Sequence, residues 1–140
     1  MKLKRLLSLA LLLTLALSLL SCFAPINFDE LWQDATYKTD KEFGNGAKTV
    51  AVEVIAGEYS VTFTIHSDKE TVGEALQEHG LIEGEEGAYG LYVKRVNGIL
   101  ADYDIDQSYW GFYKNGEMML VGVDGQTFAS GDHYELKYEK

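Results

Sequence analysis

The pattern of apolar and polar positions divides the chain into three parts. Residues 6–20 are almost wholly apolar and follow three basic residues, and residues 23–48 show no sustained period. From residue 49 onward, runs with a period of two residues alternate with breaks that contain glycine. A period of two places successive side chains on opposite faces of a strand. We therefore expect the chain beyond residue 48 to be mostly β.

The clearest hairpin signal lies in residues 50–65. The β-branched run 50–55 breaks at Ala56-Gly57-Glu58 and is followed by residues 59–65, in which apolar side chains alternate with Ser and Thr. This pattern predicts two strands that share one buried face. Further runs, each bounded by an Asn-Gly, Asp-Gly or Gly-Asp turn, predict strands within residues 89–100, 109–114, 118–123 and 133–138.

One short helix is expected after Thr71, because Thr71 and Glu74 have the spacing of a capping box. Gly80 stands where a helix commonly ends in a left-handed residue. The chain therefore has the signature of an α+β fold with about six strands in mostly antiparallel hairpins and one short helix, in a β-grasp-like arrangement.

The segment Tyr109-Trp110-Gly111-Phe112-Tyr113 carries four aromatic rings in five residues and leads into the turn Asn115-Gly116. On a strand, Tyr109 and Tyr113 share one face and Trp110 and Phe112 share the other, so both faces carry rings. This strand is either central in a two-layer fold or presents one face to a partner. The candidate ligand contacts are Tyr89, Tyr109, Trp110 and Tyr113; core packing is the competing interpretation and is preferred for Trp110 and Phe112.

The end of the first apolar stretch, Leu19-Leu20-Ser21-Cys22, resembles the lipobox of bacterial lipoproteins. The resemblance implies a signal peptide over residues 1–21 and lipidation of Cys22, which is the only cysteine. The protein would then be anchored by lipid at the extracellular face of a bacterial cell membrane. Residues 22–48 would form a tether, with Trp32 either at the lipid interface or docked back on the domain.

Charge and motif content exclude several classes of function. Residues 22–140 carry nine basic and 22 acidic residues, which makes nucleic acid an unsuitable partner. The sequence contains no catalytic nucleophile paired with a general base, and no phosphate loop, dinucleotide fingerprint or zinc spacing. We therefore expect neither an enzyme nor a bound cofactor or metal. The pattern Asp102-x-Asp104-x-Asp106 matches a calcium loop poorly and is better explained by an exposed strand edge, although weak calcium binding stays open.

The order of several motifs is similar to that of the C-terminal domain of the transcobalamin and intrinsic-factor proteins, found in bacteria as a DUF4430-type domain of unknown function. The likeness covers residues 61–138 and rests on the capped helix at Thr71, the turn Asn97-Gly98, the aromatic block through Gly116, the return Val121-Gly122-Val123 and the pair Gly131-Asp132. The resemblance implies that residues 49–140 form such a domain, which in the vertebrate carriers closes over one face of a corrin ring.

Two hypotheses follow for the function. The first is a non-catalytic cell-surface module that binds a corrinoid, cobalamin included, or another flat apolar ligand, and it predicts that at least two of the candidate rings share an exposed patch. The second is a structural or protein-interaction module of the cell envelope, which predicts buried rings and no pocket.

Overall fold

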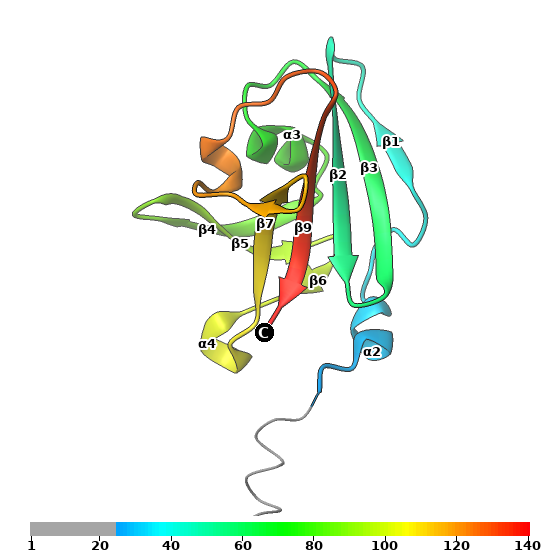
Figure 1. Ribbon diagram of the computed structural model, residues 1–140, viewed down its shortest axis with the longest axis vertical. Coiled ribbons are helices and arrows are strands. Elements are labelled where there is room, and N and C mark those ends of the chain that lie inside the picture. The colour runs from blue at the N-terminus through cyan, green and yellow to red at the C-terminus, as the bar shows by residue number, and fades with distance from the viewer. Residues whose placement is uncertain (1–24) are drawn as a thin grey trace, which may run out of the picture.

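The computed structural model describes residues 25–140 of the chain (Figure 1). The expected signal peptide and Cys22 lie outside the described residues.

Six strands form the larger sheet, in the order β1-β3-β2-β9-β7-β8. Strands β2 and β9 run parallel at its centre, with Val52 opposite Tyr134, whereas β2 with β3 and β7 with β9 pair antiparallel. The strands are β1 (Lys41–Phe43), β2 (Lys48–Ala56), β3 (Tyr59–Ser67), β7 (Tyr109–Lys114), β8 (Glu117–Met118) and β9 (Asp132–Glu139).

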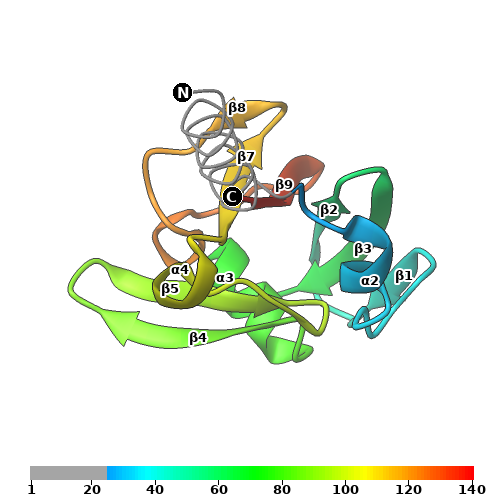
Figure 2. The same ribbon diagram turned by 90° about the horizontal axis from the view of Figure 1, so that it is seen from below.

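The smaller sheet consists of β4 (Ile82–Gly87), β5 (Gly90–Val96) and β6 (Ile99–Leu100). Viewed from below, the larger sheet curves, and the smaller sheet and helix α3 lie across its concave side (Figure 2). The core fills the space between them, because the alternate residues Val50, Val52 and Val54 of β2 are fully buried there. The remaining elements are α2 (Phe28–Trp32), α3 (Val72–Glu78), α4 (Tyr103–Asp106) and the 3₁₀ turn η1 (Val123–Gly125).

The predicted α+β class with mostly antiparallel strands is confirmed in its coarse form, and the β-grasp-like arrangement stays a prediction. The hairpin of β2 and β3 and the capped helix α3 are confirmed: the Thr71 side chain accepts a hydrogen bond from the Glu74 N–H at 3.2 Å. The described residues form nine strands and three short α-helices, where about six strands and one helix were expected.

Two segments differ in kind from the prediction. Asp102 to Asp106 form no strand edge, because Asp102 caps α4 by accepting a hydrogen bond from the Asp104 N–H at 3.1 Å. Aspartate is a favoured residue at this capping position. The return strand expected over residues 118–123 stops at Met118, and the chain leaves the sheet for η1.

The segment expected as a tether also differs, since its described part, residues 25–48, is folded onto the sheets. Trp32 is buried and its ring stacks on Tyr59 at 5.4 Å, so the docked alternative for Trp32 is confirmed. Phe43 lies on β1, which pairs parallel with β3. A segment with no period of its own is held here by contacts with residues distant in the sequence, and local patterns do not report such contacts.

Candidate functional site

Tyr109 and Tyr113 lie on the outer face of β7 and share one carboxylate, that of Glu139 on β9. The Tyr113 hydroxyl donates a hydrogen bond to Glu139 Oε1 at 2.5 Å. This hydrogen bond raises the pKa of Tyr113 to about 12, and hydrogen bonding to the same carboxylate raises the pKa of Tyr109. Gly111 lies between the two tyrosines, and a Cβ atom there would come within 2.8 Å of the Tyr113 ring. The strand therefore presents a small tyrosine pair outward.

Trp110 and Phe112 point inward from the same strand. Trp110 is 8% exposed, its Nε1 donates a hydrogen bond to the Ile99 carbonyl at 3.2 Å, and its ring meets Tyr138 edge to face at 5.5 Å. Phe112 stacks on Tyr134 at 5.4 Å. Strand β7 thus has one buried face, and the packing interpretation fits Trp110 and Phe112.

Tyr89 is the fourth candidate and lies apart from the other three, at the turn between β4 and β5. Its side chain is 100% exposed. The structure therefore distributes the four candidate rings over three places: the outer face, the core and the tip of a hairpin.

A small cavity of about 160 Å³ lies between the two sheets, and we call it the inter-sheet cleft. Its floor contains Trp110 and Phe112 of β7, and its sides contain Leu91 and Val93 of β5 and Val123 of η1. Sequence reasoning placed Trp110 near a site and did not find the other four residues. The lining is apolar, so the cleft suits an apolar group.

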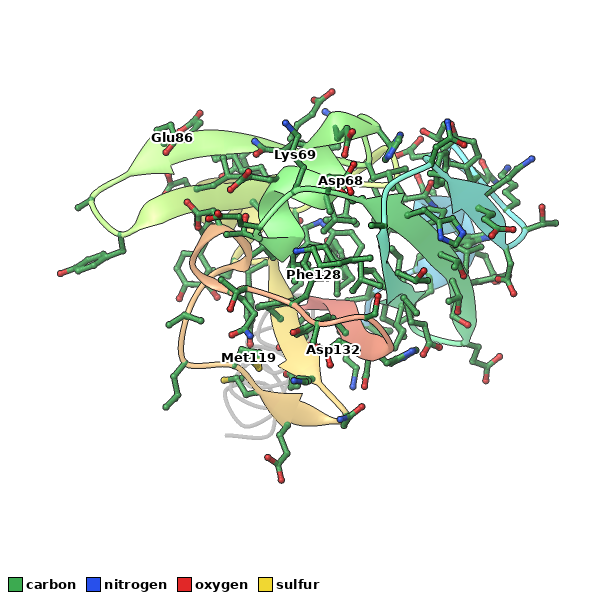
Figure 3. All side chains as sticks on the ribbon, turned by 90° about the horizontal axis from the view of Figure 1, so that it is seen from above. Asp68, Lys69, Glu86, Met119, Phe128 and Asp132 are labelled. Carbon is green, nitrogen blue, oxygen red and sulfur yellow. The ribbon has the colours of Figure 1, made fainter. Side chains whose placement is uncertain are left out.

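Exposed apolar side chains lie on the elements that border the cleft, and one of them, Tyr92, also lines it. Viewed from above, the β4–β5 hairpin with Glu86 and the β7–β8 hairpin with Met119 flank the loop that leads to η1 (Figure 3). Leu120 in that loop is 100% exposed, and the other exposed apolar residues of these elements are Tyr89, Tyr92, Met118 and Val121. Exposed apolar groups that gather on one region commonly mark a binding surface. We call these five residues the apolar rim.

The sequence contained a signal for part of this rim. Met118-Met119-Leu120-Val121 is an unbroken apolar run beside a turn, and such a run cannot place all of its side chains on one buried face of a strand.

Asp124 of η1 fixes one wall of the cleft. Its Oδ2 accepts a hydrogen bond from the Leu91 N–H at 2.8 Å. Gly90 is required beside it, because its φ is +101° and a Cβ atom there would lie 2.5 Å from Asp124 Oδ2. The loop that carries Leu120 is therefore anchored to β5 at its far end.

Two of the three carboxylates of the calcium candidate, those of Asp102 and Asp106, are engaged within the fold. Asp102 caps α4 and lies 3.5 Å from Lys94 Nζ, and Asp106 accepts hydrogen bonds from the Ser108 N–H and hydroxyl. Within residues 25–140, no three His, Cys, Asp or Glu side chains gather as a set of metal ligands. Over the same residues, no helix has the length and apolar character needed to cross a bilayer.

Comparisons with known proteins agree with this architecture. Residues 69–140 match the family described as Domain of unknown function (DUF4430). A solved structure from Ruminococcus gnavus ATCC 29149, described as a candidate metal-binding protein, is 33% identical; the match covers 67% of this chain and 98% of that chain, with a TM-score of 0.63.

Haptocorrin in complex with Cbi is a second similar structure, 22% identical, with a TM-score of 0.51. The match covers 70% of this chain and 26% of haptocorrin, so this chain spans about a quarter of that protein and the likeness concerns the fold alone. A search of the curated proteins found no match. Both similar structures are described by what they bind. The chain shares the fold of part of haptocorrin, and it belongs to the DUF4430 family.

Proposed function

We propose that this protein is a non-catalytic binding module and that its ligand lies on the apolar rim and enters the inter-sheet cleft. The observation that carries the proposal is the complete exposure of Leu120, beside other exposed apolar groups and an apolar cavity. Covering a leucine side chain contributes about 1.5 to 3 kcal/mol, so an uncovered rim is a favourable surface for an apolar partner.

The size of the cleft limits how a ligand can bind. Pockets that enclose a drug-sized molecule have volumes of about 300 to 1,000 Å³, whereas the cleft measures about 160 Å³. The cleft therefore accepts only an edge or a substituent of the ligand, while the rest of the ligand lies on the apolar rim. A flat molecule with peripheral groups meets this requirement, and the likeness to haptocorrin makes a corrinoid the first ligand to test.

This mode of binding leaves the other face of the ligand open, so a separate envelope protein can complete the site. In the same proposal the protein is held by lipid on Cys22 at the extracellular face of a bacterial membrane. Trp110 contributes to the floor and Tyr89 to the rim, while Tyr109 and Tyr113 face away from the cleft and mark the alternative location that the test must exclude.

The test is calorimetric titration of the full-length chain, in an uncharged detergent, with hydroxocobalamin. We expect saturable binding that Leu120→Ser weakens about tenfold, because that change removes roughly 1.4 kcal/mol or more of apolar contact. Ile105→Ser is the matched control, since Ile105 is also largely exposed but lies on α4, outside the cleft. It should leave the affinity unchanged.

Two results would contradict the cleft as a corrinoid site. If Tyr109→Ala and Tyr113→Ala weaken binding while Leu120→Ser does not, the ligand lies on the outer face of β7. Absence of heat up to the solubility limit would exclude direct corrinoid binding. The fully exposed Leu120 would then favour the second candidate function, a protein-interaction module of the envelope that uses the same rim.

A further inference from the structure

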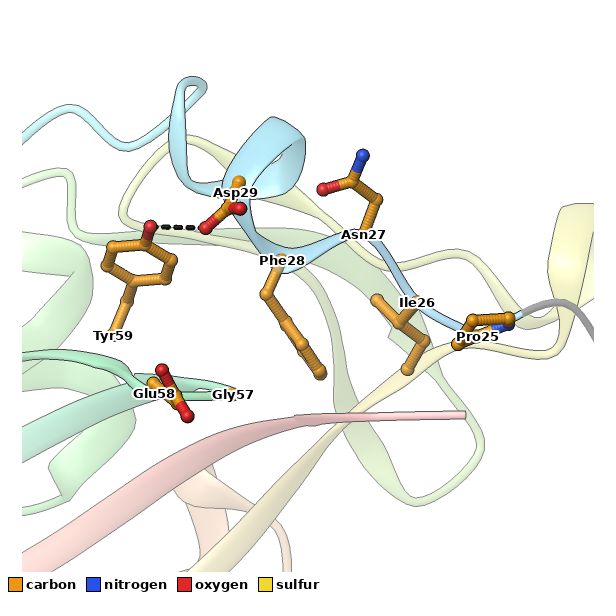
Figure 4. A pocket seen from close by; sticks show the side chains of 8 residues that line it. All are labelled: Pro25, Ile26, Asn27, Phe28, Asp29, Gly57, Glu58 and Tyr59. Carbon is orange, nitrogen blue, oxygen red and sulfur yellow. Dashed lines mark hydrogen bonds between the residues drawn. The ribbon is translucent and has the colours of Figure 1, made fainter.

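A groove of about 720 Å³ lies between the start of α2 and the turn that joins β2 and β3 (Figure 4). This volume falls within the range of small-molecule sites. Its lining comes from residues 25–29 and 57–59, and the groove shares none of these residues with the inter-sheet cleft. The groove is therefore a separate candidate site.

Two aromatic rings form the fixed part of the lining. The Phe28 ring lies directly on Gly57, where a Cβ atom would come within 2.5 Å of it, and it meets Tyr138 edge to face at 6.3 Å. One face of the Tyr59 ring is stacked on Trp32, which leaves the opposite face for a ligand. Neither ring has to reorganise to receive a ligand, so binding would carry little ordering cost.

The charged groups of the lining are both acidic. Asp29 and Glu58 are exposed carboxylates, and none of the eight lining residues is basic. Asp29 accepts a hydrogen bond from the Tyr59 hydroxyl, which holds that carboxylate beside the ring (Figure 4). The same hydrogen bond raises the pKa of Tyr59, so the phenol stays protonated at neutral pH and adds no negative charge.

This combination selects one class of ligand. Two carboxylates oppose an anion, and a neutral apolar ligand would remove water from them without replacing it. Zinc and calcium sites built from protein side chains use more ligands than these two carboxylates, and no three such ligands gather within the described residues. An organic ammonium group satisfies both features, because carboxylates attract its charge and the face of an aromatic ring attracts a cation.

We propose that the groove lined by Phe28, Asp29, Glu58 and Tyr59 binds an organic ammonium ion. The site is independent of the apolar rim, and its ligand is a small amine, either free or as the headgroup of a lipid.

Choline is the probe, titrated calorimetrically into the full-length chain in a maltoside detergent. The reference compound is its uncharged isostere, in which a tert-butyl group replaces the trimethylammonium group. We expect saturable choline binding at least about tenfold tighter than that of the isostere. Equal binding of the two compounds, or no saturable choline binding in the millimolar range, would overturn the proposal.

Near-isosteric variants locate the site. Asp29→Asn and Glu58→Gln should each weaken choline binding several-fold, whereas Glu30→Gln, which changes a neighbouring exposed carboxylate outside the lining, should have no effect. All three side chains are exposed, so the fold is retained, and unchanged melting temperatures check this. Equal effects of the three variants would show that choline is attracted by the overall negative charge of the surface. That result would overturn the proposal of a specific site in the groove.

A last titration identifies the source of the amine. Glycerophosphocholine carries the same ammonium group next to a phosphodiester, as a lipid headgroup does. Binding tighter than that of choline supports the proposal with a lipid headgroup as ligand, and weaker binding supports it with a free amine.

Discussion

The two Asn-Gly turns of this protein have the same local geometry but different surroundings. Asn97 and Gly98 have φ values of +51° and +82°, and Asn115 and Gly116 have +50° and +82°. Asn and Gly tolerate these positive angles, and both turns join antiparallel strands. From the sequence alone the two turns are indistinguishable.

Their environments are opposite. Asn97 is 2% exposed, and its side chain accepts a hydrogen bond from the Tyr37 N–H and donates one to the Tyr37 carbonyl, both at 2.9 Å. The Thr36 N–H donates to the Asn97 carbonyl, also at 2.9 Å. By contrast, nothing lies within 4 Å of a Cβ atom placed on Gly116. The first turn fastens the N-terminal segment to the smaller sheet, whereas the second is an exposed surface turn whose Gly116 N–H donates a hydrogen bond to Glu135 Oε1 at 2.9 Å. Backbone preference determines the shape of a turn. The contribution of that turn to the stability of the fold depends on its contacts with residues distant in the sequence.

The largest difference between the two turns is expected when each glycine is replaced by alanine. In Gly98→Ala the new Cβ atom would lie 2.6 Å from both the Asp34 carbonyl oxygen and Thr36 Oγ1, so it strains the backbone and displaces the docked segment. We expect a loss of about 3 to 4 kcal/mol in the free energy of unfolding. Gly116→Ala is the matched control and should cost only about 1 kcal/mol. Urea unfolding of both variants measures the difference, and equal losses would mean that the contacts of Gly98 add nothing.

Replacing the asparagines should give a smaller difference. Asn97→Ala leaves the N–H and the carbonyl of Tyr37 without their partners, and we expect a loss of about 2 to 3 kcal/mol. Asn115→Ala changes an exposed side chain and should cost about 1 kcal/mol or less, which reflects its positive φ alone. The same urea experiment tests this pair, and a loss for Asn115→Ala as large as that for Asn97→Ala would contradict the comparison.

The smallest effect depends on pH and concerns only β7, the strand that leads into the exposed turn. Hydrogen bonding to Glu139 raises the pKa of Tyr113 from 10.0 to about 12. A raised pKa stabilises the fold below the pKa of the unfolded chain, and this stability is lost as pH rises through the folded value. From neutral pH to pH 10 the stability difference between the native protein and Tyr113→Phe should therefore be constant, and it should decline from there to about pH 12.

The Asn97 contacts provide the control for this pH dependence. Neither an amide nor a peptide group titrates in this range, so the cost of Asn97→Ala should not change with pH. Unfolding experiments across the range measure both differences. A constant difference for Tyr113→Phe would show that Glu139 does not hold the Tyr113 proton.

Much of the fold was predictable wherever a local pattern determines the structure. The alternation in residues 59–65 gave β3, the capping box gave α3, and both Asn-Gly pairs form turns. Residues 25–48 were not predictable in the same way, because their order comes from partners such as Asn97, which lies 60 positions away from Tyr37.

The candidate site was predictable only in part. The sequence identified Trp110 as an important ring, and the structure places it in the floor of the cleft. The apolar run 118–121 was a signal for Leu120, but the prediction extended the return strand across that residue and so missed its exposure. The position at which β8 ends depends on which of its residues pair or pack with residues distant in the sequence. An alternation of apolar and polar residues does not identify those partners.

The parallel ladder between β2 and β9 imposes an order of events on folding. It joins Val50 to Asp132 and Ile55 to Lys137, so the centre of the larger sheet cannot close until the last strand has been made. Pairing over such long sequence separation slows folding. The segment that matches the family, residues 69–140, excludes β2, so a fragment cut there would expose one whole edge of β9. That fragment should self-associate through the open edge, and expression of the domain requires the strands that precede the family match.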